Sequence, residues 1–583
     1  MRIDLDWRAL KRGEPDAVRI DATPAEAQRV EGAGCTLLLR GEVRDAATGK
    51  PLNAAALLDR YRKQGTAFGS GLHGTYALAV VDTAAPQLLL VNDRMAMLGW
   101  CYAEQDGRIR VSDRADTIAD GSDIAAQAVF TYLFNHVIPS PDTIFHGVRR
   151  LPPAHRLLAR EGSLTVQAHW QPVFVEATAP DFGALKEQFR ELLQSAALRD
   201  AQRLGGAQVG TFLSGGTDSS TVSGMLRQAT QAPVHAYSIG FDADGYDEME
   251  YARIAARHFG LEHHEYYLTP DDVATGMPLV ATHYDQPFGN SSAVAAYHCA
   301  RVAREDGRTA LLAGDGGDEL FGGNTRYAKQ ALFGLYDRVP APVRALMQTL
   351  LDNRLAESIP GVSKAASYVQ QARVPMPDRL QMYNLLLRLG LDQVLTPGFM
   401  AQVIPSHDMQ AQRAEYARSE GATLVNRMLA FDWKYTLADN DLPKVVGTTA
   451  LAGMATAFPL LSDELLDFSL QLPAHYKLNG QKLRWFFKEA LRGFLPDQII
   501  SKKKQGFGLP FGVWALRNPQ LLKLADDALA SFSTRGVVAP AFMKRLRTEL
   551  LPAHPGYYGE LVWIIAMLEF WLREKRPNFS VDT

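Results

Sequence analysis

Residues 212–221 read FLSGGTDSST, and residues 311–323 read LLAGDGGDELFGG. Each stretch continues a short apolar run, and each leads into a pattern with helical spacing. Both therefore predict a strand, a glycine-rich loop and a helix, and neither loop has the lysine that a Walker-type phosphate loop carries after its last glycine. The two loops predict phosphate binding of another kind, where strands of a parallel sheet end and helices begin.

The first loop follows an expected strand over residues 207–213. The unpaired amides of residues 214–219 and the positive end of the helix dipole favour an anion there. Gly215 and Gly216 allow the backbone to approach that anion closely. Asp218 is a suitable ligand for a hard cation that neutralises a phosphate. These features together indicate magnesium bound to a pyrophosphate group.

The second loop follows an expected strand over residues 309–313 and offers Asp318 as a second carboxylate. Either loop alone is equally typical of a capped helix or an acidic turn. Their occurrence together, in the same strand, loop and helix context, favours a shared site. We expect the two loops to hold the β- and γ-phosphates of ATP together with Mg²⁺.

Composition narrows the class of protein. A length of 583 residues predicts two or three domains, and 61 Lys and Arg against 64 Asp and Glu exclude a basic field for nucleic acid or an anionic membrane. The three scattered cysteines do not form a zinc or disulfide pattern, which favours buried thiols in the cytoplasm. Residues 561–572 are apolar but short and contain Glu569, so they predict a helix docked on a core.

The pattern along the chain divides it in two. Residues 1–175 contain short apolar runs separated by turn residues, which predicts a layered antiparallel sheet domain. Residues 176–583 begin with alternating helices and strands and continue with helices, which predicts a parallel sheet covered on both faces and a largely helical extension. The expected fold class is α/β.

The motifs SGGTDSS, YSIGF, DQPFGNSS, GDGGDELFGG and SKKKQGFG resemble those of the asparagine synthetase B superfamily, a group of N-type ATP pyrophosphatases. The resemblance covers about residues 180–575, and more loosely residues 39–170 resemble a class II glutaminase domain of the Ntn type. Such enzymes adenylate a carboxylate, release pyrophosphate and pass the acyl group to an amine. The resemblance therefore implies an AMP-forming ligase that uses ATP and Mg²⁺.

The resemblance also implies roles for particular residues. Lys504 would stabilise charge on the adenylate, whereas Lys502 and Lys503 are expected in a solvated basic turn. Asp315 is a candidate for handling the amine proton. Asp218 and Asp318 would hold the metal. The residues expected to bind ATP and pyrophosphate are Leu213, Ser214, Gly215, Gly216, Asp218, Ser219, Ile239 and Gly314.

The N-terminal region departs from the family pattern. Class II glutaminases use an N-terminal cysteine, and here Met1 is followed by Arg2, with Cys35 the first cysteine. Arg40 stands where the family has an asparagine, and His73 where it has an acidic residue. We expect no glutaminase activity and a degenerate domain kept for structure, substrate binding or partner contact.

The expected substrate site departs as well. Asparagine synthetases carry two arginines, two acidic residues and a further aspartate in the segment that here reads VVGTTALAGMATAFPLLS, where an ungapped alignment places Val446, Gly447, Ala455, Ala457 and Ser462. Gln286 and Asn290 replace acidic residues in DQPFGNSS. Because arginine is the natural clamp for a small carboxylate, its loss favours a larger, less charged substrate. Tyr383, Trp433, Tyr435 and Phe458 are expected to be ordinary core, with a peptide cavity as the alternative.

Lasso peptide cyclases are similar in their length and in their inactive N-terminal domain. The best hypothesis is a cyclase that adenylates an Asp or Glu side chain of a linear peptide, whose N-terminal amine then closes a macrolactam. Its partners would be the peptide or another carboxylate substrate, a leader peptidase and a leader-binding protein. An ammonia-dependent asparagine synthetase, a β-lactam synthetase-like amide ligase and a non-catalytic peptide-binding homologue stay open as alternatives.

Overall fold

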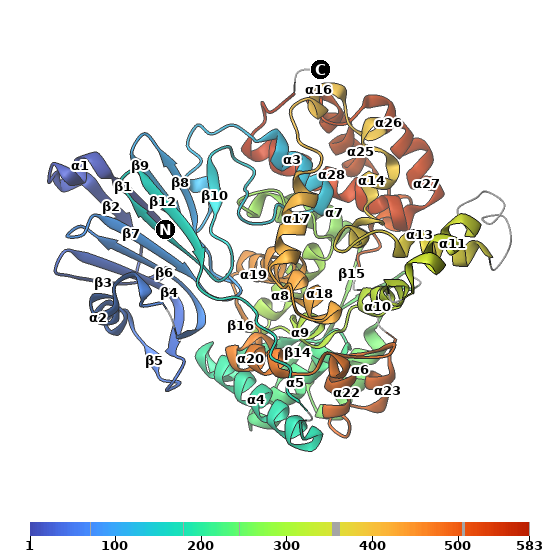
Figure 1. Cartoon of the computed structure of the whole chain (residues 1–583), viewed down its shortest axis with the longest axis horizontal. Coiled ribbons are helices and arrows are strands. Elements are labelled where there is room, and N and C mark those ends of the chain that lie inside the picture. Colours follow the sequence, from blue (N-terminus) through green and yellow to red (C-terminus); the bar gives the residue numbers. More distant parts are fainter. Residues whose placement is uncertain are drawn as a thin grey trace.

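The computed structural model describes residues 1–583 except 70, 179, 244, 338, 352–361, 504, 505, 507, 582 and 583. Figure 1 shows two antiparallel sheets formed by the first part of the chain beside a parallel sheet that helices surround. The α/β class and the change from antiparallel to parallel sheet were predicted correctly. None of the helices in the described part of the chain combines the length and the apolar character needed to span a bilayer.

The two N-terminal sheets pack face to face. The first contains β10 (Val148–Arg150), β8 (Cys101–Gln105), β9 (Arg108–Ser112), β1 (Arg2–Asp6) and β2 (Val18–Asp21), in that order. The second runs β12 (Ser163–Ala168), β11 (His155–Arg160), β7 (Gln87–Asn92), β6 (Leu72–Asp82), β4 (Cys35–Asp45) and β3 (Gln28–Gly32), and β5 (Pro51–Leu52) pairs with β4.

Side chains of β4 alternate between two buried cores, one between the two sheets and one beneath a helix. Leu38 shares a buried core with Ile3 and Val111 of the other sheet, whereas Leu37 and Leu39 pack beneath helix α2 (Ala54–Gln64). Side chains of a strand point alternately to opposite faces, so one strand supplies both cores.

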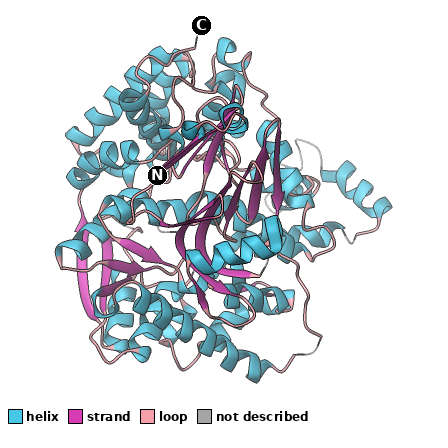
Figure 2. Cartoon of the chain, turned by 90° about the vertical axis from the view of Figure 1, so that its left-hand side faces the viewer, coloured by secondary structure: helices cyan, strands magenta, loops and turns pink. Residues whose placement is uncertain are grey.

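The parallel sheet has the order β15 (Glu262–Leu268), β14 (His235–Phe241), β13 (Val209–Phe212), β16 (Ala310–Leu312) and β17 (Ala455–Ala457). Ala236 packs in the core beneath one set of helices, and its neighbour Tyr237 packs with Cys299 beneath the other. The first set is α4 (Phe182–Arg203), α5 (Thr217–Ala229) and α6 (Met249–Phe259); the second is α7 (Pro270–His283), α8 (Ala293–Glu305) and α19 (Leu442–Leu451). Figure 2 shows the strands and helices of the chain from the side of the N-terminal region.

The remaining chain is mainly helical, as expected. It includes α10 (Thr325–Asp337), α11 (Ala341–Leu351), α13 (Val362–Ala372), α17 (His407–Ala417), α18 (Leu424–Asp432), α20 (Asp463–Gln471), α22 (Trp485–Ala490) and α25 (Pro519–Phe532). The apolar run predicted as a core helix lies in α28 (Pro555–Lys575), where Glu569 is fully buried and pairs with Arg535 at 2.5 Å. That prediction is confirmed.

The N-terminal region and the helical region share one buried core. Helix α3 (Ala126–Asn135) contributes Tyr132 to the same cluster as Ile564 of α28, and the Tyr132 hydroxyl donates to the Ile564 carbonyl at 2.8 Å. Arg150 pairs with Asp285 at 2.8 Å across the same junction. The two parts are therefore packed on each other, and the boundary near residue 175 stays a prediction.

Candidate active site

The first glycine-rich loop turns from β13 into α5. The Leu213 amide makes the last strand bond, to the Tyr237 carbonyl at 2.9 Å, and the next residues leave the sheet. Ser214 and Ser219 join their hydroxyls at 3.0 Å, which ties the loop to the first turn of the helix. Gly215 adopts a left-handed φ of 69° while a Cβ there would meet α6, so only glycine fits.

The second loop lies directly beside the first because β13 and β16 are neighbouring parallel strands. It leads from β16 into α9 (Gly317–Phe321). A Cβ on Gly314 would lie 2.7 Å from the Ser219 amide, so the two loops meet backbone to backbone at this glycine. Parallel strands bring both loops to one edge of the sheet, as the sequence predicted.

Asp218 and Asp318 converge on a single cation. The guanidinium of Arg484 forms ion pairs with both carboxylates and donates to the Thr217 hydroxyl at 2.6 Å. Arg484 has a φ of 52° and a side chain that is 5% exposed, so it is held in place as the residue before α22. The two carboxylates face the same point, and the folded chain itself supplies a positive charge there.

A cavity of about 1260 Å³ opens above the two loops. Its wall contains most of the residues predicted to bind ATP, whereas Gly215 lies behind the loop against Tyr251. The predicted residues in the lining are Leu213, Ser214, Gly216, Asp218, Ser219, Ile239, Gly314, Asp315 and Asp318.

Basic side chains gather around the loops. The lysines and arginines in the lining are Lys444, Lys482, Arg484, Lys488, Arg492, Lys502 and Lys503. Burial, and then the neighbouring Arg484, lower the pKa of Lys488. Carboxylates line the cavity as well, among them Asp218, Glu248 and Asp318, so its charge is mixed, and its cations would complement the phosphates of a polyphosphate ligand.

Lys502 is not in a solvated turn, so that expectation was wrong. Its ammonium group pairs with Glu248 at 2.8 Å and approaches the carbonyl of Gly215 at 3.5 Å, and its side chain is only 9% exposed. Lys503 is exposed, as expected. Lys504, for which a catalytic role was predicted, lies outside the described residues.

The deeper wall of the cavity holds a second charged group. Asp315 lies 3.7 Å from the ammonium of Lys444, which is also 3.0 Å from Asp441. Burial raises the pKa of Asp315 although Lys444 opposes the shift. Burial also disfavours the charge on Lys444, but Asp441 and Asp315 outweigh it and raise the pKa of that lysine. Asp315 is thus a carboxyl of raised proton affinity beside a cation.

Local backbone geometry places Lys444. The chain forms a nine-residue π-helix, η6 (Trp433–Asp441), that continues directly into α19. Wide helical turns of this kind are rare and occur frequently at functional sites. The turn brings Asn440, Asp441, Lys444 and Val445 into the cavity wall.

The ungapped alignment did not identify the positions of this segment that line the cavity. Val446 packs against the core, and Gly447 lies against the Tyr284 ring, where a Cβ would clash. Gln286 accepts from the Ile144 amide and donates to the Ile138 carbonyl at 3.3 Å, so it braces the N-terminal region. Asn290 does line the cavity and donates to Asn440 at 2.9 Å.

The residues of the site that were not identified from sequence include Arg484, Lys444, His136 and Glu560. His136 ends α3 with a φ of 64°, and its ring lies 3.6 Å from Glu560 of α28. The aromatic residues considered for a peptide cavity behave differently: Trp433 and Phe458 are buried as expected of core, but Tyr383 is 54% exposed, so core was the wrong expectation there.

The N-terminal region offers no accessible thiol among its described residues. Cys35 and Cys101 are both buried, which confirms the expectation for them and for Cys299. Burial raises the pKa of Cys35, and it raises the pKa of Cys101 to about 12. Arg40 donates to the Gly99 carbonyl at 3.2 Å and pairs with Asp113, and His73 contacts Arg94 at 3.2 Å.

Comparison with known proteins fits this architecture. The asparagine synthase family model matches residues 188–573, and a glutamine amidotransferase domain model matches residues 52–170. The chain is 24% identical to a putative glutamine-hydrolyzing asparagine synthetase of Mycobacterium bovis, over 85% of this chain and 76% of that protein. It is 21% identical to the glutamine-hydrolyzing asparagine synthetase 1 of Bacillus subtilis, over 79% of this chain and 71% of that protein. An amidase of Gibberella zeae is 23% identical, over 78% of this chain and 72% of the amidase. The chain therefore belongs to the asparagine synthase family.

Proposed function

We propose that this member of the family is a lasso peptide cyclase. It would bind a linear peptide and ATP, activate an Asp or Glu side chain as the acyl-adenylate, and join it to the peptide's N-terminal amine. AMP and pyrophosphate would leave, and the peptide would lose one water. Its partners would include a leader peptidase and a leader-binding protein.

The observation that carries the proposal is the size of the cavity. Pockets for small ligands typically measure about 300–1,000 Å³. The cavity here measures about 1260 Å³ and extends from the loops to His136 and Glu560. This volume leaves room for a peptide segment beside a nucleotide. Lys444 in its wall is already paired with Asp441 and Asp315, which makes it a poor clamp for a small substrate carboxylate.

The loops would bind the leaving pyrophosphate. Amides of residues 214–219 lie at the start of α5, where the helix dipole favours negative charge. The basic side chains around the loops would balance the charge on the phosphates and on the transition state. We assign Lys504 to the same task because of its position in the family motif.

Asp218 and Asp318 are suited to Mg²⁺. Magnesium prefers one or two carboxylates together with phosphate oxygens, and these two carboxylates already converge on one cationic group. Bound there, Mg²⁺ would neutralise phosphate charge as ATP reacts. Arg484 would then have to yield its two ion pairs.

Asp315 would accept the proton of the attacking amine. Burial raises the pKa of Asp315, which makes it a stronger base than an ordinary aspartate, and Lys444 would stabilise the carboxylate before the transfer. Leu213, Ile239 and Gly314 would line the nucleoside part of the ATP site.

Hydrolysis of glutamine is not part of the proposal. A thiolate nucleophile needs a lowered pKa and access, and the two N-terminal cysteines have the opposite properties. The amine would therefore come from the substrate itself. An ammonia-dependent asparagine synthetase or a β-lactam synthetase-like ligase would share the adenylation step and differ in the substrate.

Mass spectrometry separates these possibilities. Purified protein with Mg-ATP is given aspartate and ammonia, or a leaderless peptide encoded beside its gene. Cyclase activity requires AMP and a peptide mass lower by one water. Asparagine formation would contradict the cyclase proposal while keeping the ligase chemistry. Equal turnover by Asp218→Ala would show that the loop is not the ATP site, and no AMP with any carboxylate would favour a non-catalytic peptide-binding homologue.

A further inference from the structure

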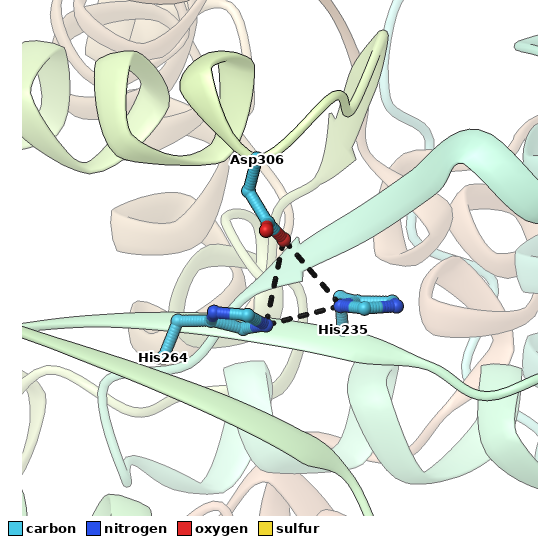
Figure 3. A group of neighbouring side chains, drawn as sticks. All are labelled: His235, His264 and Asp306. Atoms are coloured by element: carbon cyan, nitrogen blue, oxygen red, sulfur yellow. Dashed lines mark hydrogen bonds and ion pairs between the residues drawn. The ribbon is translucent and has the colours of Figure 1, made fainter.

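Two histidines and an aspartate of the parallel-sheet region converge on one another (Figure 3). His235 is the first residue of β14, His264 lies early in β15, and Asp306 follows the end of α8. The loops follow the carboxyl ends of the strands, whereas these residues gather towards their amino ends. We propose that His235, His264 and Asp306 form a zinc site separate from the ligase centre.

The spacing of the three donor atoms supports a metal site. His235 Nδ1 lies 3.0 Å from His264 Nε2, and Asp306 Oδ2 lies 3.6 Å and 3.5 Å from the same two nitrogens. Zinc bonds of about 2.0–2.1 Å in tetrahedral geometry place neighbouring ligands about 3.3 Å apart. An octahedral site with bonds of about 2.1 Å would need about 3.0 Å on every edge. The triangle is closer to one face of a tetrahedron.

Hydrogen bonds among the three side chains themselves account for only one of their three contacts. The two imidazoles are within hydrogen-bond distance of each other, but both contacts of Asp306 Oδ2 to the rings are too long for direct hydrogen bonds. In Figure 3 the carboxylate nevertheless points between the two rings. A cation at the centre of the triangle would use all three donors at once.

Tyr237 holds the donors in position. Its hydroxyl donates to Asp306 Oδ2 at 2.5 Å, and its ring stacks on His264 with centroids 4.6 Å apart and an interplanar angle of 16°. Partners of this kind orient metal ligands and are part of most metal sites. The side chains of His235, His264 and Asp306 are 25%, 31% and 39% exposed, so an ion can enter from solvent and water can complete its coordination.

Zinc bound here would join three separate segments. It would link β14 to β15 and both strands to the connection between α8 and β16, at the start of the sheet that carries the loops. The site would stabilise the sheet rather than take part in the reaction. The inference therefore does not depend on which amide the enzyme forms.

Cobalt absorption gives the direct test, because Co²⁺ bound tetrahedrally through nitrogen absorbs strongly in the visible range and octahedral Co²⁺ bound by oxygen does not. The full chain, stripped with EDTA, should bind one equivalent of Co²⁺ with this absorption. Zn²⁺ should displace the Co²⁺ and raise Tm, whereas excess Mg²⁺ should not displace it.

The variants make the test specific. Asp306→Asn keeps an acceptor for the Tyr237 hydroxyl and should fold, yet it should lower Zn²⁺ affinity at least about tenfold. His264→Ala should abolish the absorption. Two control variants should retain the absorption. His146→Ala removes an exposed histidine elsewhere, and Asp218→Ala removes a carboxylate of the ligase site. The proposal would be overturned if the absorption persisted in both His264→Ala and Asp306→Asn. It would also be overturned if the parent chain did not bind one equivalent of Co²⁺ tightly.

Discussion

Arg484 connects the structure of the ligase site to its proposed metal. The guanidinium stands between two carboxylates, and its side chain is 5% exposed. Replacing it with the uncharged side chain of methionine, in Arg484→Met, removes the guanidinium that pairs with both Asp218 and Asp318, so the repulsion between the two carboxylates is less well balanced. Two unit charges about 5 Å apart repel by about 3 kcal/mol at an effective dielectric constant of about 20.

Loss of one partner from a buried ion pair costs about 3–5 kcal/mol, which agrees with this estimate. For a chain of this size, about 1 °C of Tm corresponds to each kcal/mol, so Tm should fall by about 3–5 °C in metal-free buffer. Magnesium with pyrophosphate should recover most of that loss, because the cation would replace the missing charge. The same addition should change the Tm of the parent chain less.

Differential scanning calorimetry with EDTA or with magnesium pyrophosphate measures both effects. Arg484→Lys, which keeps a positive charge, serves as the conservative control. The double variant Arg484→Met with Asp318→Asn removes the repulsion and should be more stable than Arg484→Met alone in EDTA. An equal loss of Tm with and without magnesium would refute the idea that the two carboxylates bind the metal.

Other predictions concern protons. Asp315→Asn should lower amide formation by about 10²–10⁴-fold while pyrophosphate release on adenylation stays within about tenfold; equal losses would argue against Asp315 as the base. The parent rate should rise with pH through the raised pKa of Asp315, and Lys444→Met should move that rise to higher pH, since the carboxylate loses its cation; a profile that stays in place would contradict this. Burial, opposed by Glu176, lowers the pKa of Lys477 to about 7. Above that pH the unfolded chain binds more protons, so stability should rise by up to about 1.4 kcal/mol per unit from pH 7 to 9, and Lys477→Met should abolish the rise in Tm.

Much of the architecture could be predicted because its signals are local. The strand before each loop and the helix after it differ in the spacing of their apolar residues. In the structure the first loop joins β13 to α5, and the second joins β16 to α9. The strand expected over residues 207–213 is observed as Val209–Phe212, because residues 206–208 form a short 3-10 turn and Leu213 makes only the last bond to the neighbouring strand before the loop begins. Burial of α28 followed from its composition even though it contains Glu569, because Arg535 pairs with that carboxylate.

The site was predicted only in part, because its remaining residues depend on tertiary contacts. Arg484 meets Asp318 across 166 residues of chain, and nothing in its own sequence neighbourhood marks it. Lys502 was misassigned because its partner Glu248 belongs to a distant segment. Lys444 lies directly before the segment that was aligned, and the ungapped alignment directs attention to Val446 and Gly447 instead. The π-helix η6 determines which side chains of the following helix line the cavity, and it has no recognisable sequence signature.

The central claim is that a carboxylate attacks the α-phosphate of ATP while the two loops hold the pyrophosphate. Isotope transfer tests this most directly. A leaderless peptide encoded beside the gene is labelled with ¹⁸O in its side-chain carboxylates, incubated with the protein and Mg-ATP, and the nucleotide products are weighed by mass spectrometry. The account predicts AMP that carries one ¹⁸O atom, formed together with unlabelled pyrophosphate. ADP with ¹⁸O in inorganic phosphate would show attack on the γ-phosphate and would contradict it.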